Sequence, residues 1–216
     1  MSEPSIIVFL IGVAVSFVYL TIAHKSPSWR KTAIKTIPLL CFAISAFVAA
    51  AHPFLTMGLL LSALGDMALS RPGNKAFLYG LVSFALAHIL YALLFTSLSH
   101  QPVWAAFRVV PVFAIVMLTL AVSSEIWLTP HVANLRWPVR IYVALIGLMM
   151  LAALSLPSEF ALATLGAGAF VVSDMILSVQ RFRMTDSAKW VRRAGWAVWA
   201  FYIAGQALIL WGVVQL

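Results

Sequence analysis

The chain has 216 residues, of which 63% are hydrophobic and only 9% are charged. So small a polar fraction does not cover the surface of a water-soluble globule of this length, and we predict an integral membrane protein. The net charge of +8 would suit a nucleic-acid-binding protein, but the basic residues fall between apolar segments. We therefore expect no nucleic-acid partner. The single cysteine, Cys41, excludes an intrachain disulfide and a cysteine-based metal cluster.

Apolar runs of about 20 residues, separated by charge, proline and glycine, predict an all-α fold with eight transmembrane helices. In chain order these are 4–23, 32–51, 53–70, 76–98, 103–128, 138–156, 159–178 and 194–215. The first run follows Glu3 instead of positive charge, so we expect it to remain as a helix and not to be removed as a signal peptide. Residues 1–216 are expected to form a single transmembrane domain.

The basic residues divide unevenly between the two sides of this arrangement. Of the 14 Lys and Arg residues, only Arg108 falls on one side, and all the others fall in or beside the first, third, fifth and seventh connections. Positively charged connections face the cytoplasm, so both termini are predicted to be extracytoplasmic. In a bacterium the protein would lie in the cytoplasmic membrane.

Two aspartates stand out in a chain that has only six acidic residues. Asp66 and Asp174 lie in the near-repeats Leu64–Ser70 and Val172–Ser178, which share the pattern Asp-Met-x-Leu-Ser. Each is on the third helix of a four-helix half, which suggests a parallel internal duplication. Counted from Arg71 and Arg181, their depths differ by only about 3 Å. Carboxylates are costly within a membrane and usually face a cavity or a partner, so we expect this pair to mark the functional site.

Other polar residues are predicted at the depth of the two aspartates or closer to the middle of the membrane. Those in the cytoplasmic half are Lys35, Glu125, Arg140 and Tyr142, and those near the middle are His88, Tyr91, Tyr202 and Gln206. Together they indicate a pocket for an amphiphile with an anionic head and one apolar tail. Each also has a structural interpretation: snorkelling anchors for Lys35 and Arg140, an ion pair for Glu125, packing for His88 and an interhelical tie for Gln206.

Glycines within the apolar runs are simplest to explain as positions where helices pack closely. These are Gly80, Gly166, Gly168 and Gly205. The chain has no Walker A loop, no His-Glu-x-x-His and no Gly-x-Ser-x-Gly, so ATP coupling, zinc proteolysis and a serine lipase elbow are unsupported. The string Ala63–Asp66 matches the Gly-x-Gly-Asp motif of intramembrane aspartyl proteases only in part.

Several short strings, taken in order, resemble the YhhN family of multi-pass membrane proteins, which includes the lysoplasmalogenases. They are Lys35-x-x-Pro38, Ser62–Leu69, Phe77–Gly80 with Phe84, His88 and Tyr91, Gly166–Asp174, Arg181-Phe182 and Tyr202-x-x-x-Gln206. The first helix and residues 100–135 contribute nothing to the resemblance.

The resemblance implies hydrolysis of the vinyl ether bond of a lysoplasmalogen to a fatty aldehyde and glycerophosphoethanolamine or glycerophosphocholine. Two carboxylates in a low-dielectric site resist ionising together, so one is expected to stay protonated and to donate its proton to the alkene. The other would stabilise the cation and orient water. In this hypothesis Asp66 and Asp174 are catalytic, with their individual roles left open. Lys35 and Arg140 hold the phosphate, and His88, Tyr91, Tyr202 or Gln206 line the site.

No cofactor is expected, but a metal bound by the two carboxylates is left open, although no His accompanies them at their depth. The expected partners are a lysophospholipid substrate and the bilayer, while the oligomeric state is left open. The alternative is a proton-coupled carrier of a lipid or small molecule, in which the two intramembrane aspartates form a gate between the halves.

Overall fold

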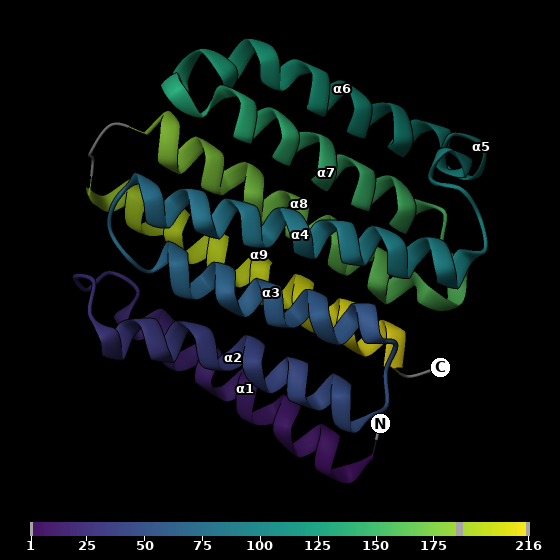
Figure 1. Ribbon diagram of the computed structural model, residues 1–216, viewed down its shortest axis with the longest axis horizontal. Helices are drawn as coiled ribbons and strands as arrows, with labels where there is room; N and C mark the ends of the chain where they lie inside the picture. The colour runs from purple at the N-terminus through teal and green to yellow at the C-terminus, as the bar shows by residue number, and fades with distance from the viewer. Residues whose placement is uncertain (1, 185–187, 215–216) are drawn as a thin grey trace.

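The computed structural model describes residues 2–184 and 188–214, and its regular structure over these ranges is entirely helical (Figure 1). The helices are α1 Glu3–Ile22, α2 Trp29–Val48, α3 Pro53–Leu69, α4 Asn74–Ser99, α5 Ala106–Val109, α6 Pro111–Trp127, α7 Arg136–Leu154, α8 Ala161–Phe182 and α9 Ala188–Val214. Short 3-10 turns cover Val103–Ala105, Thr129–His131, Ala133–Leu135 and Ser158–Phe160.

Seven helical segments in the described part of the chain are long and apolar enough to cross a membrane. The remaining long helix, α3, is apolar but has only 17 residues. Large apolar side chains also face outward, including Phe47, which is 75% exposed, and Ile126, which is 81% exposed. An outer surface of this kind is stable against lipid tails and not against water, and the chain is therefore a multi-pass membrane protein.

The helices form where the runs predict them, but one predicted helix is broken and several ends are shifted, with α2 covering 29–48 where 32–51 was predicted. The predicted helix 103–128 is wrong as a single element, because Val110 adopts an extended φ of −139° before Pro111, which begins α6. A residue before proline is disfavoured in the α conformation, and proline is best placed in the first turn of a helix. In addition, α8 continues to Phe182, beyond the predicted end at 178, and α9 begins at 188, before the predicted start at 194.

Local caps and turns position α2, α3 and α4, the helices around Asp66. Ser28 precedes α2 and accepts a hydrogen bond from the Lys31 backbone N–H at 3.2 Å. Pro53 stands at the start of α3, where its missing N–H costs nothing. Between α3 and α4 the chain turns at Gly73 with φ +102°, a conformation that favours glycine.

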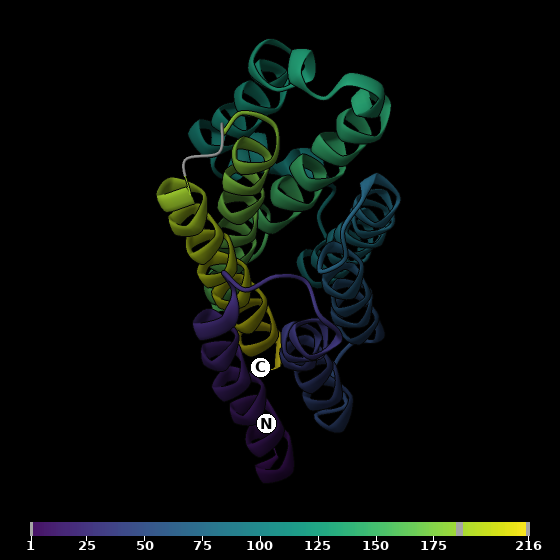
Figure 2. The same ribbon diagram turned by 90° about the vertical axis from the view of Figure 1, so that its left-hand side faces the viewer.

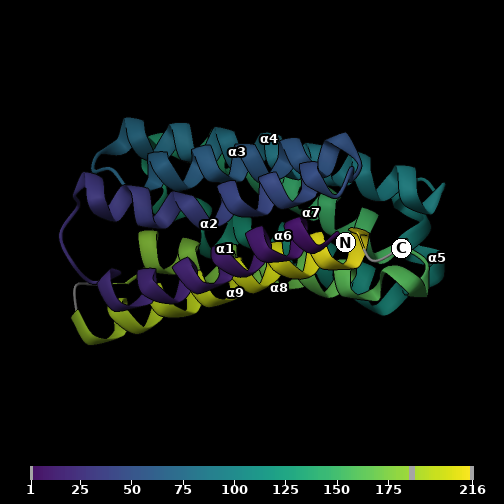
Figure 3. The same cartoon turned by 90° about the horizontal axis from the view of Figure 1, so that it is seen from below.

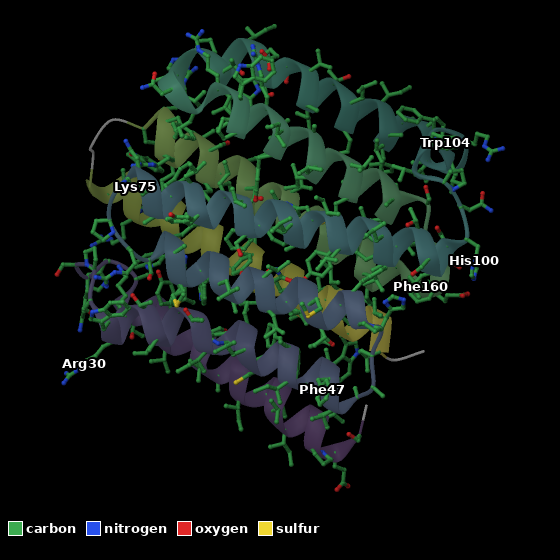
Figure 4. All side chains as sticks on the ribbon, viewed as in Figure 1. Arg30, Phe47, Lys75, His100, Trp104 and Phe160 are labelled. Carbon is green, nitrogen blue, oxygen red and sulfur yellow. The ribbon has the colours of Figure 1, made fainter. Side chains whose placement is uncertain are left out.

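The long helices run side by side along one direction, and both termini lie at the same end (Figure 1, Figure 3). α2, α3 and α4 lie on one side, with α1, α8 and α9 on the other, and α6 and α7 extend the bundle beyond α4 and α8 (Figure 2). Arg30 and Lys75 mark one end of the bundle, whereas Phe47, His100, Trp104 and Phe160 mark the other (Figure 4). We refer to the end with Arg30 and Lys75 as the basic end.

The closest helix contact is between α8 and α9, where glycine faces glycine. A Cβ added to Gly166 would meet the Gly205 carbonyl oxygen at 2.6 Å, and one added to Gly205 would meet the Gly166 oxygen at 2.8 Å. A Cβ at Gly80 would likewise meet the Leu69 side chain at 2.7 Å. These three predicted close-packing positions are confirmed. Gly168 is a wrong prediction, since its nearest neighbour would be the end of Met150 at 3.9 Å.

Candidate active site

Asp66 is held by groups from two other helices. It lies in the last turn of α3 and is 1% exposed. The Lys35 ammonium on α2 lies 3.0 Å from Oδ1, and the Tyr202 hydroxyl on α9 donates to Oδ2 at 2.7 Å. An ionised carboxylate out of water is tolerated when it is paired and hydrogen-bonded in this way. The surroundings of Asp66 therefore suit the charged form.

Asp174 has different partners. It lies on α8, and its Oδ2 accepts a hydrogen bond from the Tyr142 hydroxyl on α7 at 2.5 Å. Among residues 2–184 and 188–214, no Lys or Arg forms an ion pair with it, and the nearest basic nitrogen is His88 Nε2, at 3.9 Å from Oδ2. The two carboxylates therefore differ in one chemically decisive respect, which is that only Asp66 has a cation beside it.

Both aspartates line one cavity of about 750 Å³ near the basic end. This volume falls in the range of about 300–1,000 Å³ that is typical of small-molecule sites. The cavity lies between α2–α4 on one side and α1, α8 and α9 on the other, and we refer to it as the polar cavity. Its basic lining residues are Lys25, Lys31, Lys35, Arg71, Arg181 and Arg192. Asp66 and Asp174 thus face one space, as their positions in the sequence predict.

A second pocket, of about 110 Å³, adjoins the polar cavity between α4, α6, α7 and α8. Its walls are almost entirely apolar, with Met117, Leu120 and Ile146 among the contributors, and we refer to it as the apolar pocket. Residues that line both spaces are Leu69, Phe77, Phe84, Asp174, Leu177 and Arg181. Asp174 therefore stands at the boundary between a polar space and an apolar one.

Aromatic rings fill the space around these carboxylates. The Phe170 ring lies 4.8 Å from that of His88 and 5.4 Å from that of Tyr202, and His88 also meets Tyr142 edge to face at 5.2 Å between centroids. The His88 side chain is fully buried, and neither ring nitrogen has a hydrogen-bond partner within the described residues. The imidazole is thus in contact with the Asp174 side of the site without being fixed by any hydrogen bond there.

Four of the predicted site residues do not line the polar cavity, namely His88, Tyr91, Gln206 and Arg140. The Tyr91 hydroxyl donates to Gln206 Oε1 at 2.6 Å, and Gln206 Nε2 donates to the Ser62 hydroxyl at 2.9 Å. Both Tyr91 and Gln206 are fully buried, and they tie α4, α9 and α3 together. This is the interhelical tie that the sequence offered as the structural interpretation of Gln206.

Arg140 is also among them, so the lining of this cavity does not support its expected role as a phosphate ligand. Its guanidinium is bound by Glu125 on α6, with Nη2 to Oε2 at 2.7 Å and Nε to Oε1 at 2.9 Å. Neither residue lines the polar cavity or the apolar pocket. The alternative interpretation of Glu125, a structural ion pair with a nearby cation, is confirmed.

Sequence reasoning placed Tyr142 in the right layer but assigned it no role at the site. Arg71 and Arg181 were used to count charge and depth, and Arg181 also in the family resemblance, but neither was assigned to the site. A signal for both arginines was present, because each follows its aspartate by only five or seven residues and so lies toward the same end of the bundle. Nothing in the sequence indicated that Tyr142 faces Asp174, since that depends on how α7 rotates against α8.

The comparisons with known proteins bear on the identity of this site. A family model described as the YhhN family matches residues 30–213, which include both aspartates, Lys35 and Tyr142. The chain belongs to the YhhN family. The YhhN match begins inside α2, so α1 lies outside it, as the resemblance in the sequence had indicated.

Relatives of this YhhN protein carry one functional name. Proteins named lysoplasmalogenase in Mycobacterium bovis and Mycobacterium tuberculosis are 32% identical over 176 residues, covering 77% of this chain and 65% of theirs. The human lysoplasmalogenase TMEM86A is 32% identical over 196 residues, covering 83% of this chain and 78% of its own. The chain thus spans just under two thirds of the mycobacterial relatives. No solved structure matches it.

Proposed function

We propose that this YhhN protein hydrolyses the vinyl ether bond of a lysoplasmalogen, releasing a fatty aldehyde and glycerophosphoethanolamine or glycerophosphocholine. The observation that carries the proposal is the unequal pair of carboxylates on one cavity, Asp66 with a cation and Asp174 without one. Acid cleavage of a vinyl ether needs such a pair, with one group to give a proton and another to remain charged. The names of the relatives point to the same reaction.

Asp174 is the acid in this proposal. It transfers its proton to the alkene carbon that does not bear oxygen, and the other alkene carbon becomes part of an oxocarbenium ion. Water adds to that carbon and returns a proton to Asp174, giving a hemiacetal that breaks to the aldehyde and the glycerol hydroxyl. Asp66 stays ionised beside Lys35, orients the water and stabilises the cation, in the manner of carboxylate pairs that cleave glycosides. Tyr142 positions the Asp174 carboxyl.

The polar cavity and the adjoining apolar pocket indicate how the substrate would be oriented in the site. The head group would occupy the polar cavity, and the first part of the tail would enter the apolar pocket, so that the vinyl ether between them lies against Asp174. The apolar pocket is too small for a whole lipid tail, and the rest of the chain would follow the apolar helix faces toward the bilayer.

The membrane arrangement is part of the proposal. With 17 residues, α3 would cover about 25 Å, near the shortest length that spans a bilayer. Its position between α2 and α4 supports eight spans (Figure 1). The shared end of the two termini supports an even number, and the charge of the basic end supports extracytoplasmic termini. Asp66 and Asp174 on the third helix of each half support the parallel duplication.

The test uses purified Asp66→Asn and Asp174→Asn variants with lysoplasmenylethanolamine in detergent, with released aldehyde as the readout. Glu125→Gln is the matched control, because this carboxylate is also on a membrane helix but outside the polar cavity. We expect both aspartate variants to lose activity by about a hundredfold or more, the usual scale of one acid–base group, and Glu125→Gln to keep it. A folded aspartate variant with near wild-type activity would refute the mechanism.

The carrier alternative is favoured by one feature, namely that the two carboxylates come from separate halves and meet at one cavity. Proteoliposomes separate the two functions. The hydrolase releases aldehyde without any ion gradient, whereas a proton-coupled carrier moves intact lipid and stops when the gradient is dissipated.

A further inference from the structure

The polar cavity has more basic residues than are needed to neutralise its two carboxylates. Lys35 is already paired with Asp66, and Asp174 has no ion pair with a Lys or Arg of the described chain. The further basic residues that line the same cavity are Lys25, Lys31, Arg71, Arg181 and Arg192. A cavity of this kind concentrates cationic charge and attracts anions. The surplus charge indicates a site for an anionic group above the aspartates, toward the basic end.

Arg71 is the member of this group whose geometry points to a ligand. Its Nη1 is buried and has no hydrogen-bond partner in the described part of the chain. Its guanidinium lies 4.2 Å from the centroid of the Trp29 ring, a contact that holds its plane in place. A buried N–H donor without a partner is costly, and a fixed guanidinium is well suited to phosphate because it offers parallel donors.

Arg181 occupies the corresponding place on the other aspartate helix. It lies in the last turn of α8, lines both the polar cavity and the apolar pocket, and rests at 5.2 Å over the Phe77 ring. Its Nη2 donates to Asn74 Oδ1 at 3.3 Å, which leaves most of its N–H groups available. Each arginine therefore follows its aspartate toward the basic end, Arg71 in the turn after α3 and Arg181 in the last turn of α8.

We propose that Arg71, assisted by Arg181, binds the phosphate of a lysophospholipid head group. The inference rests on the proposed function for the identity of the lipid, and it replaces Lys35 and Arg140 as phosphate ligands. Arg71 follows Asp66 by five residues and lies just beyond the end of α3, whereas Arg181 follows Asp174 by seven residues, about 10 Å along the axis of α8. Side chains on a helix lean back toward its N-terminus, which shortens the gap at Arg181 to a distance that a glycerol unit can span. Phosphate bound there would hold the ether bond at the level of the carboxylates.

The test measures binding instead of turnover, in an uncharged detergent. The ligands are lysophosphatidylethanolamine, which carries an ester and no vinyl ether, a monoacylglycerol with the same tail and no phosphate, and inorganic phosphate alone. The variants are Arg71→Gln and Arg181→Gln. Arg30→Gln is the control, because Arg30 lies at the same end of the bundle but does not line the polar cavity (Figure 4).

We expect Arg71→Gln to weaken lysophosphatidylethanolamine binding by about tenfold or more, the scale of a lost charge-assisted hydrogen bond. Arg181→Gln should weaken it less, and monoacylglycerol affinity should change in neither variant. Arg30→Gln should match wild type. Arg71→Lys keeps the charge but loses the paired donors, so it should bind with intermediate affinity, and it replaces Arg71→Gln if that variant does not fold.

Two results would overturn the inference. One is an unchanged ratio of lysophosphatidylethanolamine to monoacylglycerol affinity in the Arg71 variants. The other is inorganic phosphate binding at Arg71 that lysophosphatidylethanolamine does not displace, which would make a free anion the ligand. Because the test lipid is not cleaved, the result stays readable even if the protein has no lysoplasmalogenase activity. Retained activity with an unchanged affinity ratio would remove only the Arg71 assignment.

Discussion

Removing the cation beside Asp66 should destabilise the fold more than any other single charge change at the site. The Lys35 ammonium and the Asp66 carboxylate are 3.0 Å apart, and their side chains are 14% and 2% exposed. At that distance two unit charges attract by about 5.5 kcal/mol in an effective dielectric of about 20. Lys35→Met keeps the length of the aliphatic side chain and removes the charge, so Asp66 is left buried with only the Tyr202 hydroxyl as a partner.

Two estimates limit the loss of unfolding free energy that we expect for Lys35→Met. Breaking a buried ion pair by removing one partner typically costs about 3–5 kcal/mol. Without its cation, Asp66 can become neutral by binding a proton. Protonating an aspartate of ordinary pKa costs about 4 kcal/mol at pH 7. We therefore expect Lys35→Met to lose about 3–4 kcal/mol of unfolding free energy. The double variant Lys35→Met/Asp66→Asn should recover most of it, because neither partner then carries a charge.

Denaturant unfolding in detergent, followed by tryptophan fluorescence, gives the unfolding free energies of the single and double variants for a double-mutant cycle. Arg140→Met is the matched control: it removes a cation from an ion pair whose side chains are 37% and 44% exposed, and such pairs contribute little. If Lys35→Met unfolds at the same denaturant concentration as wild type, Asp66 does not depend on Lys35 for its charge. The assignment of Asp66 as the ionised member of the pair would then fail.

Other predictions follow from individual contacts. Tyr142→Phe removes the hydroxyl that positions Asp174, so kcat should fall at least tenfold while the fold survives, as monitored by aldehyde release and size-exclusion chromatography. Tyr91→Phe breaks a tie outside the polar cavity and should lower stability by about 0.6–1.7 kcal/mol, the range for interhelical hydrogen bonds in membranes, with activity unchanged. Gly205→Ala places a Cβ at 2.8 Å from the Gly166 oxygen and should destabilise by about 1–3 kcal/mol, whereas Gly168→Ala should be tolerated; equal unfolding midpoints would contradict the close contact of α8 and α9. Chelators should leave activity unchanged, and a loss that Zn²⁺ or Mg²⁺ restores would replace the acid–base mechanism with a metal-dependent one.

The helices were predictable because each depends on a local run of apolar residues long enough to cross a membrane. The short α3 was found for the same reason, with Pro53 marking its start. The break before Pro111 has a local cause as well, since proline belongs in the first turn of a helix, but a continuous apolar run concealed it.

The site was predictable only to the level of depth. Depth places Asp66 and Asp174 together, because residues near the same end of parallel helices lie in one layer. It does not tell which way a residue faces around the helix axis. Arg140 and Tyr142 are two residues apart on α7, and they face Glu125 on α6 and Asp174 on α8 respectively. The rotation of α7 between its neighbours decides which of them joins the site, and many apolar contacts set that rotation.

The central claim is that this protein cleaves a vinyl ether with Asp174 as the acid. The most direct measurement is lipid mass spectrometry of a mixed lysolipid panel, containing vinyl ether, alkyl ether and ester species, after incubation with the purified protein and with Asp174→Asn. The account predicts that wild type consumes only the vinyl ether species, with matching amounts of fatty aldehyde, and that Asp174→Asn consumes none. Loss of the ester species, or vinyl ether cleavage by folded Asp174→Asn at the wild-type rate, would contradict it.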